Sequence, residues 1–124
     1  MAGLKVMVVE DTDHVRRMLI SMLELDGFEV VGSVGDGAEA VAQVASADPD
    51  VVVLDFKMPG LDGIDTARLI REERPDQALI LYTAFIDDDL KARAAEAGIS
   101  VCLGKVEGLP ALEREIRRLA GSLF

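Results

Sequence analysis

Two different periods of apolar residues alternate along this chain. Five short apolar runs, each bounded by turn-forming or polar residues, have the length of strands that are buried on both faces. They cover residues 4–9, 28–34, 51–55, 78–83 and 99–103. Between and after these runs, apolar residues recur at intervals of three and four, which is the period of an amphipathic helix. The pattern therefore predicts about five strand–helix units.

The buried face of each expected helix is a stripe of apolar residues. The stripes are Val15, Met18, Leu19, Met22 and Leu23; Ala38, Val41, Ala42 and Ala45; Ile64, Ala67 and Ile70; Leu90, Ala94 and Ala97; and Leu109, Leu112, Ile116 and Leu119. We expect the third helix to end near Pro75 and the fourth at Gly98, a residue suited to a left-handed helix end. Asp13 and Asp62 stand before helical patterns and are expected to cap them.

Alternating strands and helices indicate a parallel sheet with right-handed crossovers and helices on both faces. The expected fold is α/β: a flavodoxin-like, doubly wound sheet of five parallel strands in the order 2-1-3-4-5. There is no internal repeat, low-complexity tract or linker, so we expect one domain over residues 1–124. The last helical pattern runs almost to Phe124, and a separate output domain is not expected within this chain.

The composition narrows the possible functions. The 124 residues include 23 acidic and 13 basic side chains, giving a net charge of -10 that disfavours direct binding to nucleic acid or anionic lipid. The single cysteine, Cys102, cannot form an internal disulfide and suits a reducing compartment. No signal peptide or membrane-spanning apolar run is visible, so a cytoplasmic location is expected.

Three carboxylates follow two of the expected strands. Asp55 ends the apolar run 51–55, and Glu10 and Asp11 follow the run 4–9. In open α/β sheets, ligands bind at the carboxyl edge of the strands, and a flavodoxin-like order makes the first and third strands neighbours. Because Mg²⁺ prefers one or two carboxylates together with waters and phosphoryl oxygens, we expect Asp11 and Asp55 as direct ligands and Glu10 to act through water.

Two further polar residues follow later strands. The Thr83 hydroxyl can donate a hydrogen bond to a phosphoryl oxygen, and the Lys105 ammonium is a compact charge suited to phosphate. Asp55 can itself accept a phosphoryl group, as carboxylates do in enzymes that form aspartyl-phosphate. Each residue alone is consistent with a solvated loop or helix cap. The ordered combination of an acidic pair, Asp, Thr and Lys, each after its own strand, favours phosphoryl chemistry.

On these residues the chain resembles, over its whole length, the receiver domain of bacterial two-component response regulators. The matching residues are the acidic pair Glu10 and Asp11, the acceptor Asp55 with Met58, Pro59, Gly60 and Gly63 after it, Thr83 with Ala84, and Lys105. The resemblance implies Mg²⁺-dependent phosphoryl transfer from a kinase phosphohistidine to Asp55. It also implies the backbone carbonyl of Lys57 as a further metal ligand.

The same resemblance implies the partners of this chain. These are a sensor histidine kinase or phosphotransfer protein, a downstream protein or fused output domain, and a second copy if phosphorylation drives dimerisation. It implies a signalling switch that catalyses only its own phosphorylation and dephosphorylation. The net charge of -10, independently of the resemblance, argues against direct contact with nucleic acid or membrane.

The chain departs from many receivers at two positions. Cys102 stands where many have Tyr or Phe, and Val106 where many have Pro. We therefore expect no buried-aromatic switch, and instead coupling from Thr83 through residues 84–89 to the fourth helix. The output face would comprise the fourth helix, fifth strand and fifth helix. In residues 83–89, and in the absence of proline after Lys105, the chain is similar to receivers that are joined to LuxR-type helix-turn-helix domains.

Two other functions fit the sequence less well. A Mg²⁺-dependent phosphohydrolase with an aspartyl nucleophile, of the haloacid-dehalogenase type, carries a second Asp where this chain has Lys57. A flavin carrier would need a phosphate-binding loop at residues 10–13, where three acidic residues would repel phosphate. The glycine-rich residues 32–37 are expected to form a turn, Asp87–Asp89 a helix start, and Cys102 a buried small hydrophobe.

Overall fold

The structure of this chain, a computed structural model, describes residues 3–121. The elements are β1 Lys5–Val9, α1 Asp13–Leu25, β2 Glu29–Val34, α2 Gly37–Ala47, β3 Val51–Leu54, α3 Gly63–Glu73, β4 Ala78–Thr83, α4 Asp88–Glu96, β5 Val101–Gly104, the short 3-10 helix η1 Lys105–Glu107, and α5 Leu109–Gly121. The expected continuation of the last helix toward Phe124 lies outside the described residues. Within residues 3–121, every helix is too short or too polar to cross a membrane.

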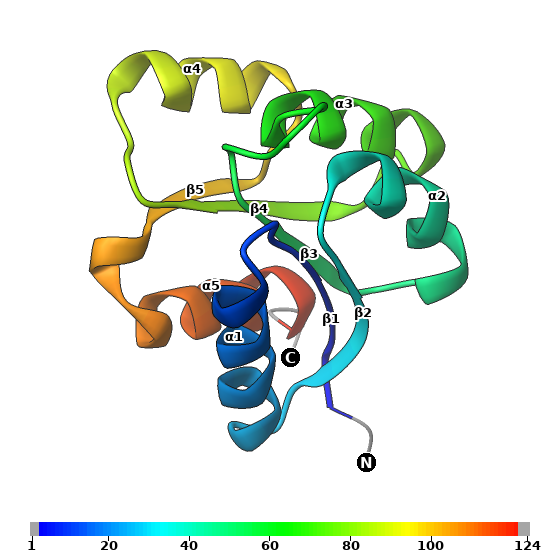
Figure 1. Cartoon of the computed structure of the whole chain (residues 1–124), viewed down its shortest axis with the longest axis vertical. Helices are drawn as coiled ribbons and strands as arrows, with labels where there is room; N and C mark the ends of the chain where they lie inside the picture. Colours follow the sequence, from blue (N-terminus) through cyan, green and yellow to red (C-terminus); the bar gives the residue numbers. More distant parts are fainter. Residues whose placement is uncertain (1–2, 122–124) are drawn as a thin grey trace.

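All five strands are parallel and lie in the order β2-β1-β3-β4-β5 (Figure 1), as predicted. The register pairs Val9 of β1 with Leu54 of β3, and Leu54 with Leu81 of β4. At the far end of the sheet, Thr83 pairs with Gly104. The carboxyl ends of β1, β3, β4 and β5 therefore meet at one edge, which brings together residues far apart in the sequence.

Each face of the sheet packs against its own set of helices (Figure 1). One core joins β1, β3 and β4 side chains such as Val52 and Leu54 to α2, α3 and α4. The other joins Val51 and Val53, the alternate positions of the same strand, to α1 and α5. Because successive side chains of a strand point to opposite faces, a central strand with two covered faces must be apolar throughout. This requirement explains the unbroken Val-Val-Val-Leu run of β3.

The predicted apolar stripes are correct for α3, α4 and α5 but wrong in part for the first two helices. In α1, Leu23 is fully buried, whereas Met18 and Met22 are 61% and 43% exposed. In α2, the buried residues are Gly37, Ala40 and Val44, while Ala38, Ala42 and Ala45 are exposed. Both helices carry small or apolar residues around most of their circumference, so the sequence leaves the orientation about the helix axis to tertiary packing.

The helix ends follow the expected chemistry with one exception. Asp62 caps α3 by accepting a hydrogen bond from Asp65 N at 2.8 Å. Gly98, after the end of α4, has a φ of 85° and so adopts the left-handed conformation predicted for it. The expectation that Asp13 caps α1 is wrong, because the N-cap is Thr12. Asp13 is instead the first helical residue and pairs with Arg16.

Three more sequence-based expectations concern single segments. Asp87 caps α4 by accepting from Leu90 N at 2.8 Å, which confirms the acidic run as a helix start. Residues 32–34 belong to β2, so the expected turn begins only at Gly35. Cys102 is partly exposed rather than buried, because β5 is the edge strand of the sheet.

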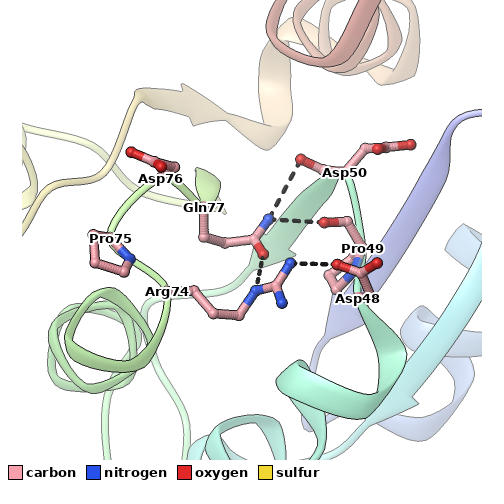
Figure 2. A pocket seen from close by; sticks show the side chains of 7 residues that line it. All are labelled: Asp48, Pro49, Asp50, Arg74, Pro75, Asp76 and Gln77. Atoms are coloured by element: carbon pink, nitrogen blue, oxygen red, sulfur yellow. Dashed lines mark hydrogen bonds and ion pairs between the residues drawn. The ribbon is translucent and has the colours of Figure 1, made fainter.

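At the opposite, amino-terminal edge, Gln77 ties the loop before β3 to the loop before β4 (Figure 2). Its amide nitrogen donates to Pro49 O at 3.2 Å and Asp50 O at 3.3 Å. Its oxygen accepts from Arg74 Nε at 2.8 Å, and the Arg74 guanidinium pairs with Asp48 at 2.8 Å. The buried amide is therefore fully bonded within the protein. The pocket that these residues line is a structural contact between two loops and lies far from the carboxyl edge.

Candidate functional site

Three carboxylates converge at the carboxyl edge of the sheet. One oxygen from each of Glu10, Asp11 and Asp55 lies within 4.8 Å of the other two. Glu10 and Asp11 follow β1 directly, and Asp55 follows β3. The backbone N–H of Asp55 donates to Val9 O at 3.1 Å, so the pairing of β1 with β3 extends to the first residue of the site. Strand adjacency thus brings together acids that are about 45 positions apart.

Lys105 joins two of these acids. Its ammonium nitrogen lies 2.8 Å from Glu10 Oε1 and 3.1 Å from Asp55 Oδ2. Partial burial lowers the pKa of this ammonium, but hydrogen bonds and charge attraction from Glu10 and Asp55 outweigh that effect and raise the pKa above its ordinary value. Lys105 therefore remains charged and offsets part of the repulsion between the carboxylates.

Both oxygens of Asp55 already have a donor. Oδ2 accepts from Lys105, and Oδ1 accepts from the backbone N–H of Phe56 at 2.7 Å. Glu10 is only 4% exposed, and its second oxygen accepts from Thr12 N at 3.1 Å. These bonds fix the orientation of both carboxylates before any ligand arrives.

The remaining predicted site residues lie around the same edge. Asp11 and Asp55 line an open pocket together with Lys57. Thr83 is 5% exposed at the end of β4 and lines an adjoining pocket with Lys57 and Phe85. Phe85 is 77% exposed, so most of its ring lies in solvent. The structure therefore brings all the predicted site residues to one rim of the sheet.

Sequence reasoning missed Arg93. Its guanidinium lies over the ring of Phe56, 5.6 Å from the ring centroid. Phe56 directly follows Asp55, and Arg93 belongs to α4. The sequence carries no signal for a contact between residues so far apart, because only the packing of α4 beside the β3–α3 loop creates it.

Arg16 was missed as well. Its Nη1 donates to the backbone carbonyl of Glu10 at 2.7 Å, and its Nη2 pairs with Asp13. Here a signal existed, since Arg16 lies in the first turn of the helix that follows the acidic pair, three residues after Asp13.

The donor set is suited to a divalent cation. Three carboxylates face one ammonium, so the site keeps a net negative charge, and its donors are the hard oxygens that Mg²⁺ prefers. Asp11 and Asp55 are partly exposed and so can reach a hydrated ion, whereas Glu10 is buried against Lys105. The cluster is therefore compatible with metal binding, with Asp11 and Asp55 as the acids that a hydrated ion can reach.

Comparison with known proteins places these features in a family context. A family model described as the response regulator receiver domain matches residues 6–117. The transcriptional regulatory protein PdtaR of Mycobacterium tuberculosis H37Rv is 40% identical over 129 residues, covering 96% of this chain and 62% of the relative. The response regulator GacA of Pseudomonas syringae pv. syringae is 35% identical over 115 residues, covering 92% of this chain and 54% of the relative. The chain thus spans only part of the length of these relatives.

Solved structures share the fold. The response regulator domain of CheB from Thermotoga maritima has a TM-score of 0.86 at 27% identity, covering 95% of this chain and 96% of that one. The response regulator TrrA of the same organism, solved in complex with Mg²⁺-BeF, has a TM-score of 0.83 at 27% identity, covering 94% and 98%. A LuxR-family response regulator from Aurantimonas sp. SI85-9A1 has a TM-score of 0.84 at 28% identity, covering 92% and 85%.

Proposed function

Because this chain belongs to the response regulator receiver domain family of two-component signalling, we propose that it is a switch operated by Mg²⁺-dependent phosphorylation of Asp55. The observation that carries the proposal is the meeting of Glu10, Asp11, Asp55 and Lys105 at one edge of the sheet. No separate substrate is turned over: the chain accepts a phosphoryl group and later loses it by hydrolysis.

The transfer reaction uses Asp55 as the nucleophile. One of its carboxylate oxygens attacks the phosphorus of a phosphohistidine, the P–N bond breaks, and the electron pair leaves with the imidazole nitrogen, which takes up a proton. Asp11, Asp55 and the Lys57 carbonyl would hold Mg²⁺, which neutralises charge on the phosphoryl oxygens when bound. Glu10 would act on the ion through water while it keeps Lys105 in place.

Two residues are proposed to hold the phosphoryl group once it is attached. The Lys105 ammonium now lies at 3.1 Å from Asp55 Oδ2 and can pair with a phosphoryl oxygen after a small movement. The Thr83 hydroxyl, at the end of the neighbouring strand, can donate to another oxygen. Movement of Thr83 would then be transmitted through residues 84–89 to α4.

The proposed output face comprises α4, β5 and α5. Phe85 and Val106, which are 77% and 90% exposed, border a pocket on this side together with Cys102. Exposed apolar side chains around a pocket are a common feature of protein-binding surfaces. The occupant would be a downstream protein, a fused output domain or a second copy. The donor would be a sensor histidine kinase or phosphotransfer protein, which we place with this chain in the cytoplasm.

We propose that residues 1–124 form a single receiver domain, since one continuous sheet contains strands from both ends of the described region.

The alternative function as a phosphohydrolase has no support in the site. Lys57 occupies the position two residues after Asp55, where such an enzyme of the haloacid-dehalogenase type carries a second Asp.

Phosphorylation from a small donor tests the proposal. Incubation with acetyl phosphate and Mg²⁺ should add one acid-stable, base-labile phosphoryl group, detectable by mass spectrometry. An Asp55→Asn variant should remain unmodified, and an Asp50→Asn variant, exposed at the opposite edge of the sheet, should be modified like the wild type. Full labelling of Asp55→Asn at the wild-type rate would contradict the assignment of the acceptor.

A further inference from the structure

Arg16 of α1 packs against the acidic loop, which is formed by residues 10–12 between β1 and α1. Its Nη1 donates to Glu10 O at 2.7 Å, and its Nη2 pairs with the Asp13 carboxylate. The Arg16 side chain is only 18% exposed, whereas Asp13 is 74% exposed. Because an ion pair with so exposed a partner contributes little, the bond to the Glu10 carbonyl is the contact that matters.

The β2–α2 loop leaves space for this guanidinium. A methyl group added at Gly35 would lie 3.2 Å from Arg16 Nη1, so the absence of a side chain lets the guanidinium lie against this loop. The segment after β2 is a short loop that leads into α2. It provides one wall of the space that Arg16 occupies, and the acidic loop provides the other.

The bonded carbonyl belongs to the peptide that links Glu10 to Asp11. Fixing this peptide restricts the direction in which the Asp11 side chain leaves the backbone. Glu10 is held separately, through Lys105 and the Thr12 amide, whereas the structure gives the Asp11 carboxylate no hydrogen bond of its own among the described residues. The placement of Asp11 therefore depends on the backbone. Arg16 holds this backbone at the Glu10 carbonyl, beside the bonds from Glu10 N to Val34 O and from Thr12 N to Glu10 Oε2.

We infer that Arg16 is a positioning residue for metal binding: by holding the Glu10 carbonyl it orients Asp11 toward the ion, without touching the ion or the phosphoryl group itself. The inference rests on the proposed Mg²⁺-dependent phosphorylation. Residues that orient metal ligands from outside the ligand set commonly change metal affinity by about 10–100-fold when they are mutated.

The direction of the change in Mg²⁺ affinity distinguishes a positioning role of Arg16 from a purely electrostatic one. Removing a cation near three carboxylates should tighten the binding of Mg²⁺ if only electrostatics matter. Removing the hydrogen bond that orients Asp11 should weaken it. Arg17 provides the matched control, because it is the next residue of α1, carries the same charge and is exposed.

Titration with MgCl₂, followed by backbone amide shifts, gives the dissociation constant for Mg²⁺. We expect Arg16→Gln to raise this constant by about tenfold and Arg17→Gln to leave it unchanged or slightly lower. Arg16→Lys, which keeps the charge but loses the planar fork of donors, should raise it by about threefold. At saturating Mg²⁺, the acetyl phosphate labelling rate of Arg16→Gln should return to the wild-type rate.

Each outcome of the titration and labelling experiments supports or overturns the positioning role of Arg16, or refutes the function on which it rests. Mg²⁺ binding by Arg16→Gln that is as tight as in the wild type, or tighter, would overturn the inference. So would a labelling defect that persists at saturating Mg²⁺, because Arg16 would then act on the transfer step. Circular dichroism checks that each variant is folded; if Arg16→Gln is not, Arg16→Lys decides by the same criterion. Wild-type protein that neither binds Mg²⁺ nor accepts phosphate would instead refute the proposed function.

Discussion

The Lys105 ammonium lies 3.1 Å from Asp55 Oδ2, although 50 positions separate the two residues in the chain. The same nitrogen lies 2.8 Å from Glu10 Oε1. One cation thus holds both the proposed acceptor and a carboxylate that is only 4% exposed. Before any phosphoryl group arrives, this bridge limits the cost of crowding acids at the end of the sheet.

Replacing Lys105 by Met should therefore destabilise the protein in the absence of Mg²⁺. Leaving the buried Glu10 carboxylate without its partner should cost about 1–3 kcal/mol in the free energy of unfolding. Urea unfolding measures this loss, and added Mg²⁺ should restore more stability in Lys105→Met than in the wild type, because the acids then lack their internal cation. Lys91→Met, which removes an exposed lysine of α4, should show neither effect.

Asp11→Ala should lose both Mg²⁺ binding and phosphorylation of Asp55. Asp11 is a partly exposed acid of the cluster, and its carboxylate accepts no hydrogen bond among the described residues, whereas both oxygens of Asp55 already have donors. Asp88→Ala, which removes an exposed acid from the start of α4, is the control for a change in net charge and should keep both properties. Amide-shift titration and acetyl phosphate labelling measure the two. Retention of both by Asp11→Ala would place the metal elsewhere.

A phosphoryl mimic such as beryllofluoride should shift amide resonances mainly in residues 83–89, α4 and β5. Thr83 and the loop after it lie beside α4, and Arg93 of α4 also contacts Phe56, the neighbour of Asp55. Cys102 offers no ring for a buried-aromatic switch. A comparison of amide spectra with and without the mimic tests this route. Changes confined to α1 and α2 would contradict it.

The phosphorylated form should be long-lived because Lys57 and Phe85 border the same pocket as Thr83. Hydrolysis needs a water in line with the breaking bond, opposite Asp55. We expect the Phe85 ring, which borders this pocket although it is 77% exposed, to obstruct that approach and to offer the water no hydrogen bond. We expect Lys57 to add bulk and positive charge near the phosphoryl oxygens. The double variant Lys57→Asn, Phe85→Ala should lose phosphate several times faster, timed beside the wild type by mass spectrometry. Equal rates would refute the shielding by these side chains and leave the acceptor assignment intact.

Glu113 of α5 should make stability depend on pH. Burial, together with hydrogen bonding and charge from Asp26, raises the pKa of this carboxyl to about 7, and its Oε2 has no hydrogen-bond partner among residues 3–121. Between pH ~4.5 and ~7 the folded state keeps a proton that the unfolded state has released, so the free energy of unfolding falls as pH rises through this window and then levels off. Glu113→Gln should flatten the profile and stabilise the protein by about 1–2 kcal/mol at pH 8.

The matched control for that profile is Glu115→Gln on the same helix. The hydrogen bond and charge of Arg118 lower the pKa of Glu115, which is the opposite direction. Its replacement should leave the fall in stability between pH ~4.5 and ~7 unchanged. A wild-type profile that stays flat from pH 4.5 to 7 would show that Glu113 titrates normally.

The sequence by itself predicted the strands, their order and the meeting of the candidate site residues at one edge of the sheet. A parallel strand covered on both faces must be apolar throughout, so runs such as residues 51–54 mark it without further information. Polar residues directly after such strands can only lie at the carboxyl edge. For that reason Asp55, Thr83 and Lys105 could be assigned to one site before their neighbours were known.

Tertiary structure alone decided the contacts between side chains from different elements. The exposure of Met18 follows from how α1 lies on the sheet, and the partial exposure of Cys102 follows from the position of β5 at its edge. The bonds from Arg16 to Glu10 and from Lys105 to Asp55 likewise depend on the distance and angle between elements. Periodicity records which face of an element is apolar, but hydrogen bonds depend on positions to within a few tenths of an ångström, which only the packed fold sets.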